Sequence, residues 1–424
     1  MLHEALFRGW YFTRDGYEVC VFAAGSKLGK GGSWWIAIGF FLISAAPGMW
    51  FPVLPNILNT QGIGWVLPYA FAVGPFVALF SPLIFGSMAD YRFSAQKLVG
   101  SLSILGAGFL GMAFWALHMG WGPWWYLAFQ VFNALLGAPM WALLSTVTLA
   151  NVDDAQKKFP LFRVWGSIGW VAAGLSVSLM EWDSSPLAGV AAAGVRVLFG
   201  LTCYMMPDTP PRGKLEVGRS NWRKNLGLDA LVLFKDAPMR VFLLTALFFT
   251  IPLGAFYMYA PIQLKELGDS HPAASMTLGQ ITEIFAMLVL GWLMARGRLK
   301  WVLVLALVLG LARYVLFAIS GWSGGLLWMW LGIAMHGPCY TFFFITGQVL
   351  VDRRVDPAMR GQAQALLGTI DGGIGCLLGS LFCGWYYAGT QHLTHNWVFF
   401  WGSLALVVLM CTLYFTAGFG RGRR

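Results

Sequence analysis

A few charged and polar side chains lie inside long apolar stretches of this sequence, and they are the residues that could do chemistry. Gln280 and Glu283 are three residues apart, so they would share one face of a helix. The Glu283 carboxylate could bind hydroxyl or amino groups or carry a proton, and the alternative is a structural hydrogen bond to a neighbouring helix. Asp371 lies among glycines and is a second candidate proton carrier, with a hydrogen bond at a helix kink as the alternative.

Arg163 and Ser167 are one helical turn apart and could face the same cavity. Arg163 could pair with a carboxylate in that cavity, or extend its charged end to a polar boundary. Other polar and aromatic side chains could line a cavity or connect neighbouring helices: Asn133, Tyr257, Tyr340 and Thr341. Three isolated ionisable residues are interpreted as structural: Arg196, Arg313 and His336.

The elements that must position these residues are apolar helices. Of the 424 residues, 58% are hydrophobic and 11% are charged, whereas a soluble domain has roughly 25% charged residues. A soluble enzyme, a disordered regulator and a nucleic-acid-binding protein are therefore excluded. About 20 mostly apolar residues span a bilayer, and twelve such runs predict an all-α integral membrane protein. The runs are 34–57, 65–88, 97–118, 123–149, 160–180, 187–206, 238–262, 275–295, 300–320, 324–350, 361–386 and 395–417.

The basic residues predict the orientation of these helices. All but four of the 28 Lys and Arg residues fall on one side when the connections are assigned alternately to the two sides, and only Lys265 lies in an opposite loop. By the positive-inside rule, both termini are cytoplasmic, as in a multi-pass inner-membrane protein. The net charge of +10 is therefore mostly a topology signal, and we expect no nucleic-acid partner.

One long polar break divides the chain into two halves. We expect an extension at 1–33, a six-helix bundle at 34–206, a cytoplasmic linker at 207–237, a second six-helix bundle at 238–418 and a basic tail at 419–424. Glycine and arginine recur after the second and eighth runs, in the Gly86–Arg92 and Gly291–Arg298 segments. Two related halves of six helices are typical of secondary transporters.

The Gly86, Asp90 and Arg92 pattern resembles the loop signature of the major facilitator superfamily, where it serves as a conformational loop. A sharper resemblance, over roughly 34–415, is to the nucleoside:proton symporter family of that superfamily. Its characteristic stretches correspond to Phe162–Gly169, Leu226–Lys235, Gln280–Glu283 and Asp356–Gln364. The resemblance implies two pseudo-symmetric six-helix bundles (the major facilitator fold) around a central site, and nucleoside uptake driven by the proton gradient. It also implies a monomer, and places Arg163, Ser167, Gln280 and Glu283 at or near the substrate.

Two positions depart from the family pattern. Thr341 stands where family members carry an acid after an aromatic residue, and Asp371 stands where an uncharged amide is expected. The leading hypothesis is a proton-coupled symporter for nucleosides or similar ring-bearing polar solutes, with Glu283 and Asp371 as the proton-coupling groups. The alternative is an uncoupled or differently coupled transporter of a sugar or another small metabolite.

An enzyme is not expected, because the sequence shows no Ser/His/Asp set and no HExxH motif. The six cysteines have no ligand spacing, so we expect no metal and no cofactor. The expected partners are therefore a small nucleoside-like substrate, protons and the lipid bilayer.

Overall fold

The computed structural model describes residues 30–81, 85, 93–152, 155–211, 228–296, 298–356 and 359–420. Gly86, Asp90 and Arg92, the predicted conformational loop, lie outside the described residues, as do most of the predicted extension, much of the linker and the end of the tail. The described part of the chain is helical and contains no strand. This confirms the all-α prediction.

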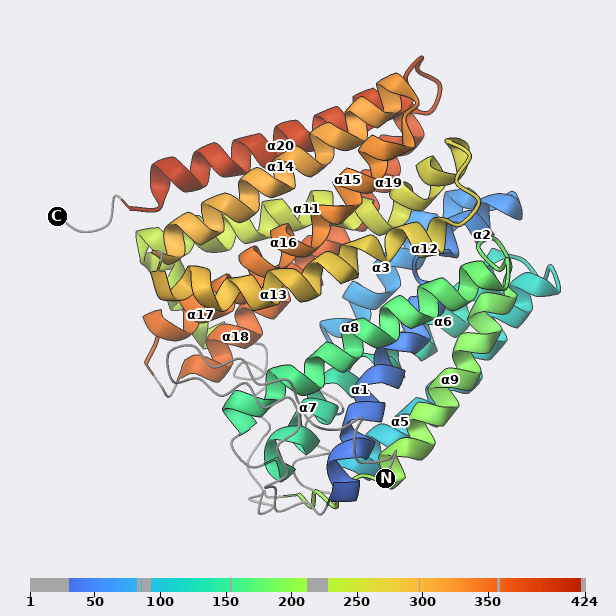
Figure 1. Ribbon diagram of the computed structural model, residues 1–424, viewed down its shortest axis with the longest axis vertical. Coiled ribbons are helices and arrows are strands. Elements are labelled where there is room, and N and C mark those ends of the chain that lie inside the picture. The colour runs from blue at the N-terminus through green and yellow to red at the C-terminus, as the bar shows by residue number, and fades with distance from the viewer. Residues whose placement is uncertain are drawn as a thin grey trace, which may run out of the picture.

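The first half forms a bundle of helices, coloured blue to green in Figure 1. Prolines at or near the start of several helices fix the backbone for a first turn, where no N–H bond is lost. The helices are α1 (Lys30–Trp50), α2 (Leu54–Thr60), η2 (Gly64–Val66), α3 (Leu67–Ala78), α5 (Ala95–His118), α6 (Pro123–Gly137), α7 (Met140–Asn151), α8 (Ala155–Leu179) and α9 (Leu187–Tyr204).

The second half forms another bundle beside the first, coloured yellow to red in Figure 1. Two of its membrane-spanning segments are interrupted by π-helical turns, η4 and η6. The elements are η3 (Leu228–Lys235), α11 (Ala237–Glu266), α12 (Pro272–Met276), α13 (Leu278–Arg296), α14 (Leu299–Ser323), α15 (Leu326–Ala334), α16 (His336–Tyr340), η4 (Thr341–Ile345), α17 (Thr346–Arg354), α18 (Arg360–Gly368), η6 (Thr369–Gly375), α19 (Cys376–Thr390) and α20 (Asn396–Gly418).

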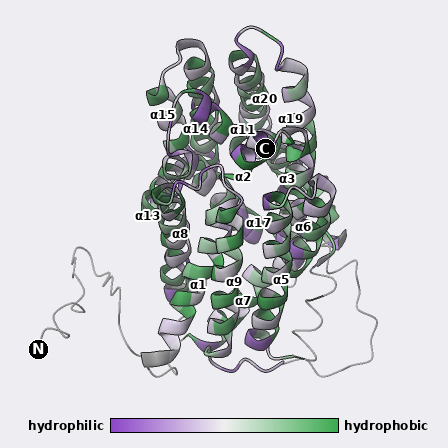
Figure 2. Cartoon of the chain, turned by 90° about the vertical axis from the view of Figure 1, so that its right-hand side faces the viewer, coloured by the Kyte–Doolittle hydropathy of each residue, from purple (hydrophilic) through white to green (hydrophobic). Residues whose placement is uncertain are grey.

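In its described residues, each of the twelve predicted apolar runs falls on a helix or a chain of consecutive helices. Within the described residues, nine helices are long and apolar enough to cross a membrane. The other three runs contain the shorter α3, the more charged α8, and the segment α15 to α17 that η4 interrupts. Figure 2 shows hydrophobic residues along most of the length of the helices. Large apolar side chains such as Leu288 and Trp385 face outward, as contact with lipid requires.

The two halves are joined at one end of the bundle. There α2 packs on α11, α8 packs on α12, and α3 packs on α19. The Asn56 side-chain N–H donates to the Pro261 carbonyl across the halves, at 3.2 Å. The exposed Lys265 ammonium donates to the hydroxyls of Thr60 and Ser184. At the opposite end, no hydrogen bond or ion pair between the halves is found among the described residues.

Candidate functional site

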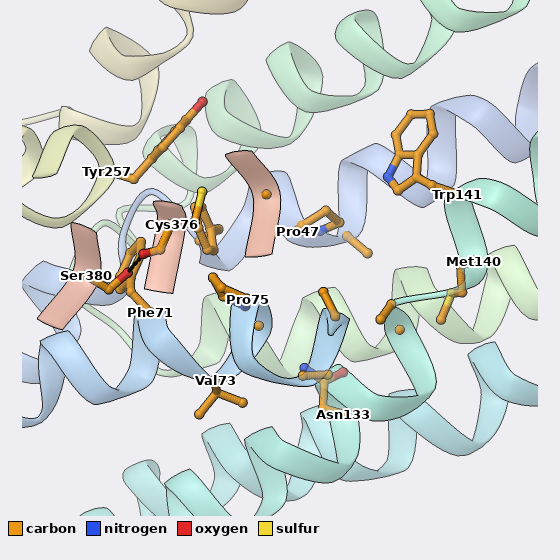
Figure 3. Close-up of a pocket in the computed structure, with 18 of the residues that line it drawn as sticks. Pro47, Phe71, Val73, Pro75, Asn133, Met140, Trp141, Tyr257, Cys376 and Ser380 are labelled. Atoms are coloured by element: carbon orange, nitrogen blue, oxygen red, sulfur yellow. Dashed lines mark hydrogen bonds between the residues drawn. The ribbon is translucent and has the colours of Figure 1, made fainter. Parts of the chain in front are cut away.

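A cavity of about 710 Å³ lies between the two halves. Its walls come from α1, α3, α5, α6, α7 and α9 of the first half and from α11, α16, η4, α17, η6 and α19 of the second. In Figure 3, Tyr257 and Ser380 lie on one side of this space and Asn133 and Trp141 on the other. A cavity bounded by both halves changes its access when the halves move, which is the geometry that alternating access requires.

Most of the cavity wall is apolar and aromatic. Across the halves, the rings of Phe51 and Tyr257 are 5.3 Å apart between centroids. Tyr257 also contacts His336, and the rings of Tyr340 and Phe344 lie 4.7 Å apart in the second half. Aromatic faces of this kind pack well against a planar ring, and the few polar groups among them would set its orientation.

Two of the predicted polar residues reach the cavity from helices that π-helical turns interrupt. Tyr340 precedes η4 and Asp371 lies within η6, and both line the cavity. A π-helical turn shifts the side chains that follow it around the helix axis and is frequent at functional sites. The backbone N–H of Gly372 donates to the Asp371 carboxylate at 2.6 Å. The glycine-rich sequence around Asp371 therefore forms a distorted turn that presents a carboxylate to the cavity.

Gln280 lies directly behind the cavity wall. Its side-chain N–H donates to the Tyr257 hydroxyl at 2.8 Å, and Tyr257 lines the cavity. The Gln280 side chain is only 6% exposed, and its carbonyl oxygen has no hydrogen-bond partner among the described residues. An orphaned acceptor of this kind is costly, so Gln280 is poised to accept a hydrogen bond from a further group.

Glu283 and Arg163 come from different halves and are electrostatic neighbours. Glu283 is partly buried on α13, and the absence of a side chain at Gly337 lets α16 approach its backbone. The Arg163 guanidinium lies over the ring of Trp141, 6.0 Å from its centroid. No ion pair within 4 Å joins Glu283 to any of the residues described. Neither residue lines the cavity in this conformation.

Ser167 and Thr341 also lie outside the cavity wall. Ser167 is partly buried on α8, one turn after Arg163. Thr341 is fully buried at the start of η4, and its hydroxyl has no partner among the described residues. Of the eight residues predicted to bind substrate, Asn133, Tyr257 and Tyr340 line the cavity, and the others lie behind or beside it.

Two further ionisable residues line the cavity, although the sequence analysis interpreted them as structural. Arg196 lines it from α9 and donates to the Asn133 side-chain carbonyl. His336 lines it from α16, and its Nδ1 is 3.1 Å from the guanidinium of the fully buried Arg313. Their sequence neighbours are apolar, so the only sequence signal for this part of the cavity was Asn133, which was predicted to line a cavity. Within the described residues, no group of His, Cys, Asp and Glu could hold a metal ion.

The chain was compared with known protein families, sequences and structures. The family described as "Nucleoside H+ symporter" matches residues 35–423. The "Putative nucleoside transporter YegT" of Escherichia coli (strain K12) is 33% identical over 389 residues, which cover 87% of this chain and 89% of that protein. The nucleoside permease NupG of the same organism is 27% identical over 348 residues, covering 78% and 80%. A crystal structure of nucleoside transporter NupG has a TM-score of 0.79 at 24% identity, over 91% of this chain and 98% of that one.

The structural likeness identifies the major facilitator type of fold, in which two helical bundles enclose a central cavity. The match to the family extends over nearly the whole described chain, including both walls of the cavity. The chain therefore belongs to the nucleoside H+ symporter family.

Proposed function

We propose that this protein imports nucleosides across the inner membrane together with protons, by alternating access and without chemical change to the substrate. The observation that carries the proposal is the cavity between the halves, aromatic along its walls and polar at a few points. A nucleoside has a flat base that can stack on Tyr257 or Tyr340 and a ribose rich in hydroxyl groups. The volume of about 710 Å³ is within the range of small-molecule sites.

In this proposal, Gln280 and Glu283 bind ribose hydroxyls in a conformation in which the halves have moved together around the substrate. Support comes from the orphaned carbonyl oxygen of Gln280 and from the absence of an ion-pair partner for Glu283 among the described residues. Arg163 and Ser167 approach the same substrate from α8. Thr341, whose buried hydroxyl also has no partner, is proposed to join the site only when η4 rearranges.

Glu283 and Asp371 are the proposed proton carriers. A carboxylate without a close cation is costly in a closed, dry cavity, so it must bind a proton or a substrate before the site changes access. Among the described residues, neither Glu283 nor Asp371 has a cation within ion-pair distance, although Arg163 interacts with Glu283 at longer range. Proton binding at either group would couple the movement of the halves to the proton gradient.

The orientation follows from the charge asymmetry of the connections. The end where α2, α8 and α12 join the halves is then periplasmic, and both termini are cytoplasmic. On this basis we propose that the end closed in this structure is the periplasmic one. We propose that the monomer is the transporting unit, because its cavity is formed by one chain alone.

The test is uptake of radiolabelled uridine and inosine into proteoliposomes under an imposed inward proton gradient. We expect concentrative uptake that collapses when an ionophore removes the gradient. Glu283→Gln should abolish accumulation, and Asp371→Asn should retain exchange of labelled for unlabelled substrate but lose accumulation. Asp229→Asn is the matched control, because Asp229 is an exposed carboxylate in η3 outside the cavity.

Full accumulation by the Glu283→Gln variant would remove that residue from the mechanism. Uptake by the unmodified protein that is saturable but indifferent to the proton gradient would favour the alternative, an uncoupled transporter. Accumulation of a sugar and not of a nucleoside would overturn the proposed substrate class.

A further inference from the structure

Arg196 is a buried cation at the wall of the cavity. It lies on α9, is 8% exposed, and is one of the residues that line the space between the halves. Two glycines make room for its guanidinium, because a side chain at Gly106 or Gly137 would meet its nitrogen atoms. Helices α5 and α6 thus hold the guanidinium in one place against the cavity.

The partners of Arg196 are amides, and their acceptors are already in use. The guanidinium donates to the Asn133 side-chain carbonyl, and more weakly to the Asn133 backbone carbonyl at 3.4 Å. The Asn133 amide N–H donates to the Gln130 carbonyl oxygen at 2.6 Å, and the Gln130 amide donates to the Tyr126 hydroxyl at 3.1 Å. The side-chain oxygens of Asn133 and Gln130 therefore each already accept a hydrogen bond.

Arg196 itself has unused donors. A guanidinium has five N–H donors, and the two hydrogen bonds to Asn133 leave the others unused. Among the described residues, the buried Nε has no hydrogen-bond partner and no carboxylate forms an ion pair with Arg196. A guanidinium has only donors, in a planar arrangement that suits carbonyl and other oxygen acceptors. Since a buried unpaired charge is costly, a substrate that supplies an oxygen acceptor here gains affinity, and one that supplies an amino group does not.

We propose that Arg196, supported by Asn133 and Gln130, is a specificity-determining contact for the oxo edge of a nucleobase. This inference rests on the proposed function, since it assumes that a nucleoside occupies the cavity. The site would select bases with a carbonyl oxygen at purine position 6 or pyrimidine position 4, as in inosine and uridine, over bases of the same size with an amino group at that position, as in adenosine and cytidine. The base would then lie between Arg196 and Tyr257, and the ribose would extend toward Gln280 and Glu283 of the second half.

The test is equilibrium binding to the purified protein, with inosine against adenosine and uridine against cytidine as size-matched pairs. The amino member of each pair cannot accept a hydrogen bond from the charged Arg196, so the buried donor and the buried amino group are both left without a partner. This predicts that the protein binds the oxo member about tenfold more tightly or better. Arg196→Gln should bring both ratios to within about twofold of one, because an amide offers an acceptor as well as a donor. It also keeps a donor for Asn133, which favours a folded variant.

Two further variants make the result interpretable. Arg196→Lys keeps the charge and its donors, so it should retain part of the preference and shows whether position 196 tolerates substitution. Thr202→Ala removes a polar group from the same helix whose hydroxyl bonds only to the Leu198 carbonyl, and it should leave the ratios unchanged.

Equal binding of inosine and adenosine by the unmodified protein would overturn the inference, as would a ratio that survives Arg196→Gln. Binding with the expected ratio supports the role of Arg196, even if the bound nucleoside is not accumulated under a proton gradient. A lack of accumulation would contradict only the proposed proton-coupled transport. Failure of the Arg196 inference and failure of the proposed function can therefore be told apart.

Discussion

The closed end of the structure depends on a small set of hydrogen bonds, and removal of Asp183 should open it. The Asp183 carboxylate, in the loop between α8 and α9, accepts the Ala273 backbone N–H of the other half at 2.7 Å. The same oxygen accepts the Ser178 hydroxyl at 3.0 Å, and that hydroxyl in turn accepts the Ala274 N–H. Asp183→Ala breaks the direct bond between the halves and releases the Ser178 hydroxyl.

The size of the effect follows from the hydrogen bond that Asp183 accepts from Ala273 across the halves, because the bond from Ser178 lies within the first half and survives opening. A hydrogen bond to a charged acceptor contributes about 1.5–3 kcal/mol. Its loss therefore changes the ratio of closed to open states by roughly 10- to 150-fold.

The assay uses a reporter cysteine at Thr277, which is buried and faces Gly174 of α8 across the halves. Labelling by a membrane-impermeant maleimide should be slow in the closed state and should accelerate by the stated factor in Asp183→Ala. Glu181→Gln is the control, because it removes an exposed carboxylate from the same loop. An unchanged labelling rate in Asp183→Ala, or an equal increase in the control, would refute the reasoning.

Three further predictions concern pH and two glycines. Burial raises the pKa of the Asp183 carboxyl above its ordinary value, because the ionised form loses hydration that the protonated form needs less. Both forms accept the Ala273 N–H, so closure should be strongest below the ordinary carboxyl pKa and lose this added contribution as pH rises through the raised pKa. Reporter labelling, corrected for thiol ionisation, should therefore speed up with pH, and Asp183→Asn should remove this dependence. Gly106→Ala would displace the Arg196 guanidinium and should lower inosine affinity toward that of adenosine, measured by the same titration. Gly337→Ala places a methyl group against the backbone of α13 and should cost about 1–3 kcal/mol in thermal stability, whereas Gly291→Ala, with open space around it, should not.

The fold was predictable from local properties of the chain. Hydropathy is a property of a run of residues, so the apolar runs located the helices before any packing was known. The short motifs, such as Phe162–Gly169 and Gln280–Glu283, are contiguous, so the family could be identified from them, and the match over residues 35–423 confirmed it. The ends of the helices and the π-helical turns at Thr341 and Asp371 were not predicted, because they depend on neighbouring helices.

The site was only partly predictable, because it is built from residues far apart in the sequence. Asn133, Tyr257 and Tyr340 were expected to line a cavity, and all three line the one between the halves. Arg196 was interpreted as a structural residue, because its neighbours on its own helix are apolar. Its role at the cavity became visible only from its contact with Asn133, 63 residues earlier, and from its unused hydrogen-bond donors.

The sequence by itself determined that this chain crosses the membrane many times and which family it belongs to, because apolar length and short motifs are read along the chain. The tertiary structure decided which end of the bundle is closed and which polar groups share one cavity. The physical reason is that closure depends on contacts such as Asp183 with Ala273, 90 residues apart, whose geometry is set by how closely the helices pack.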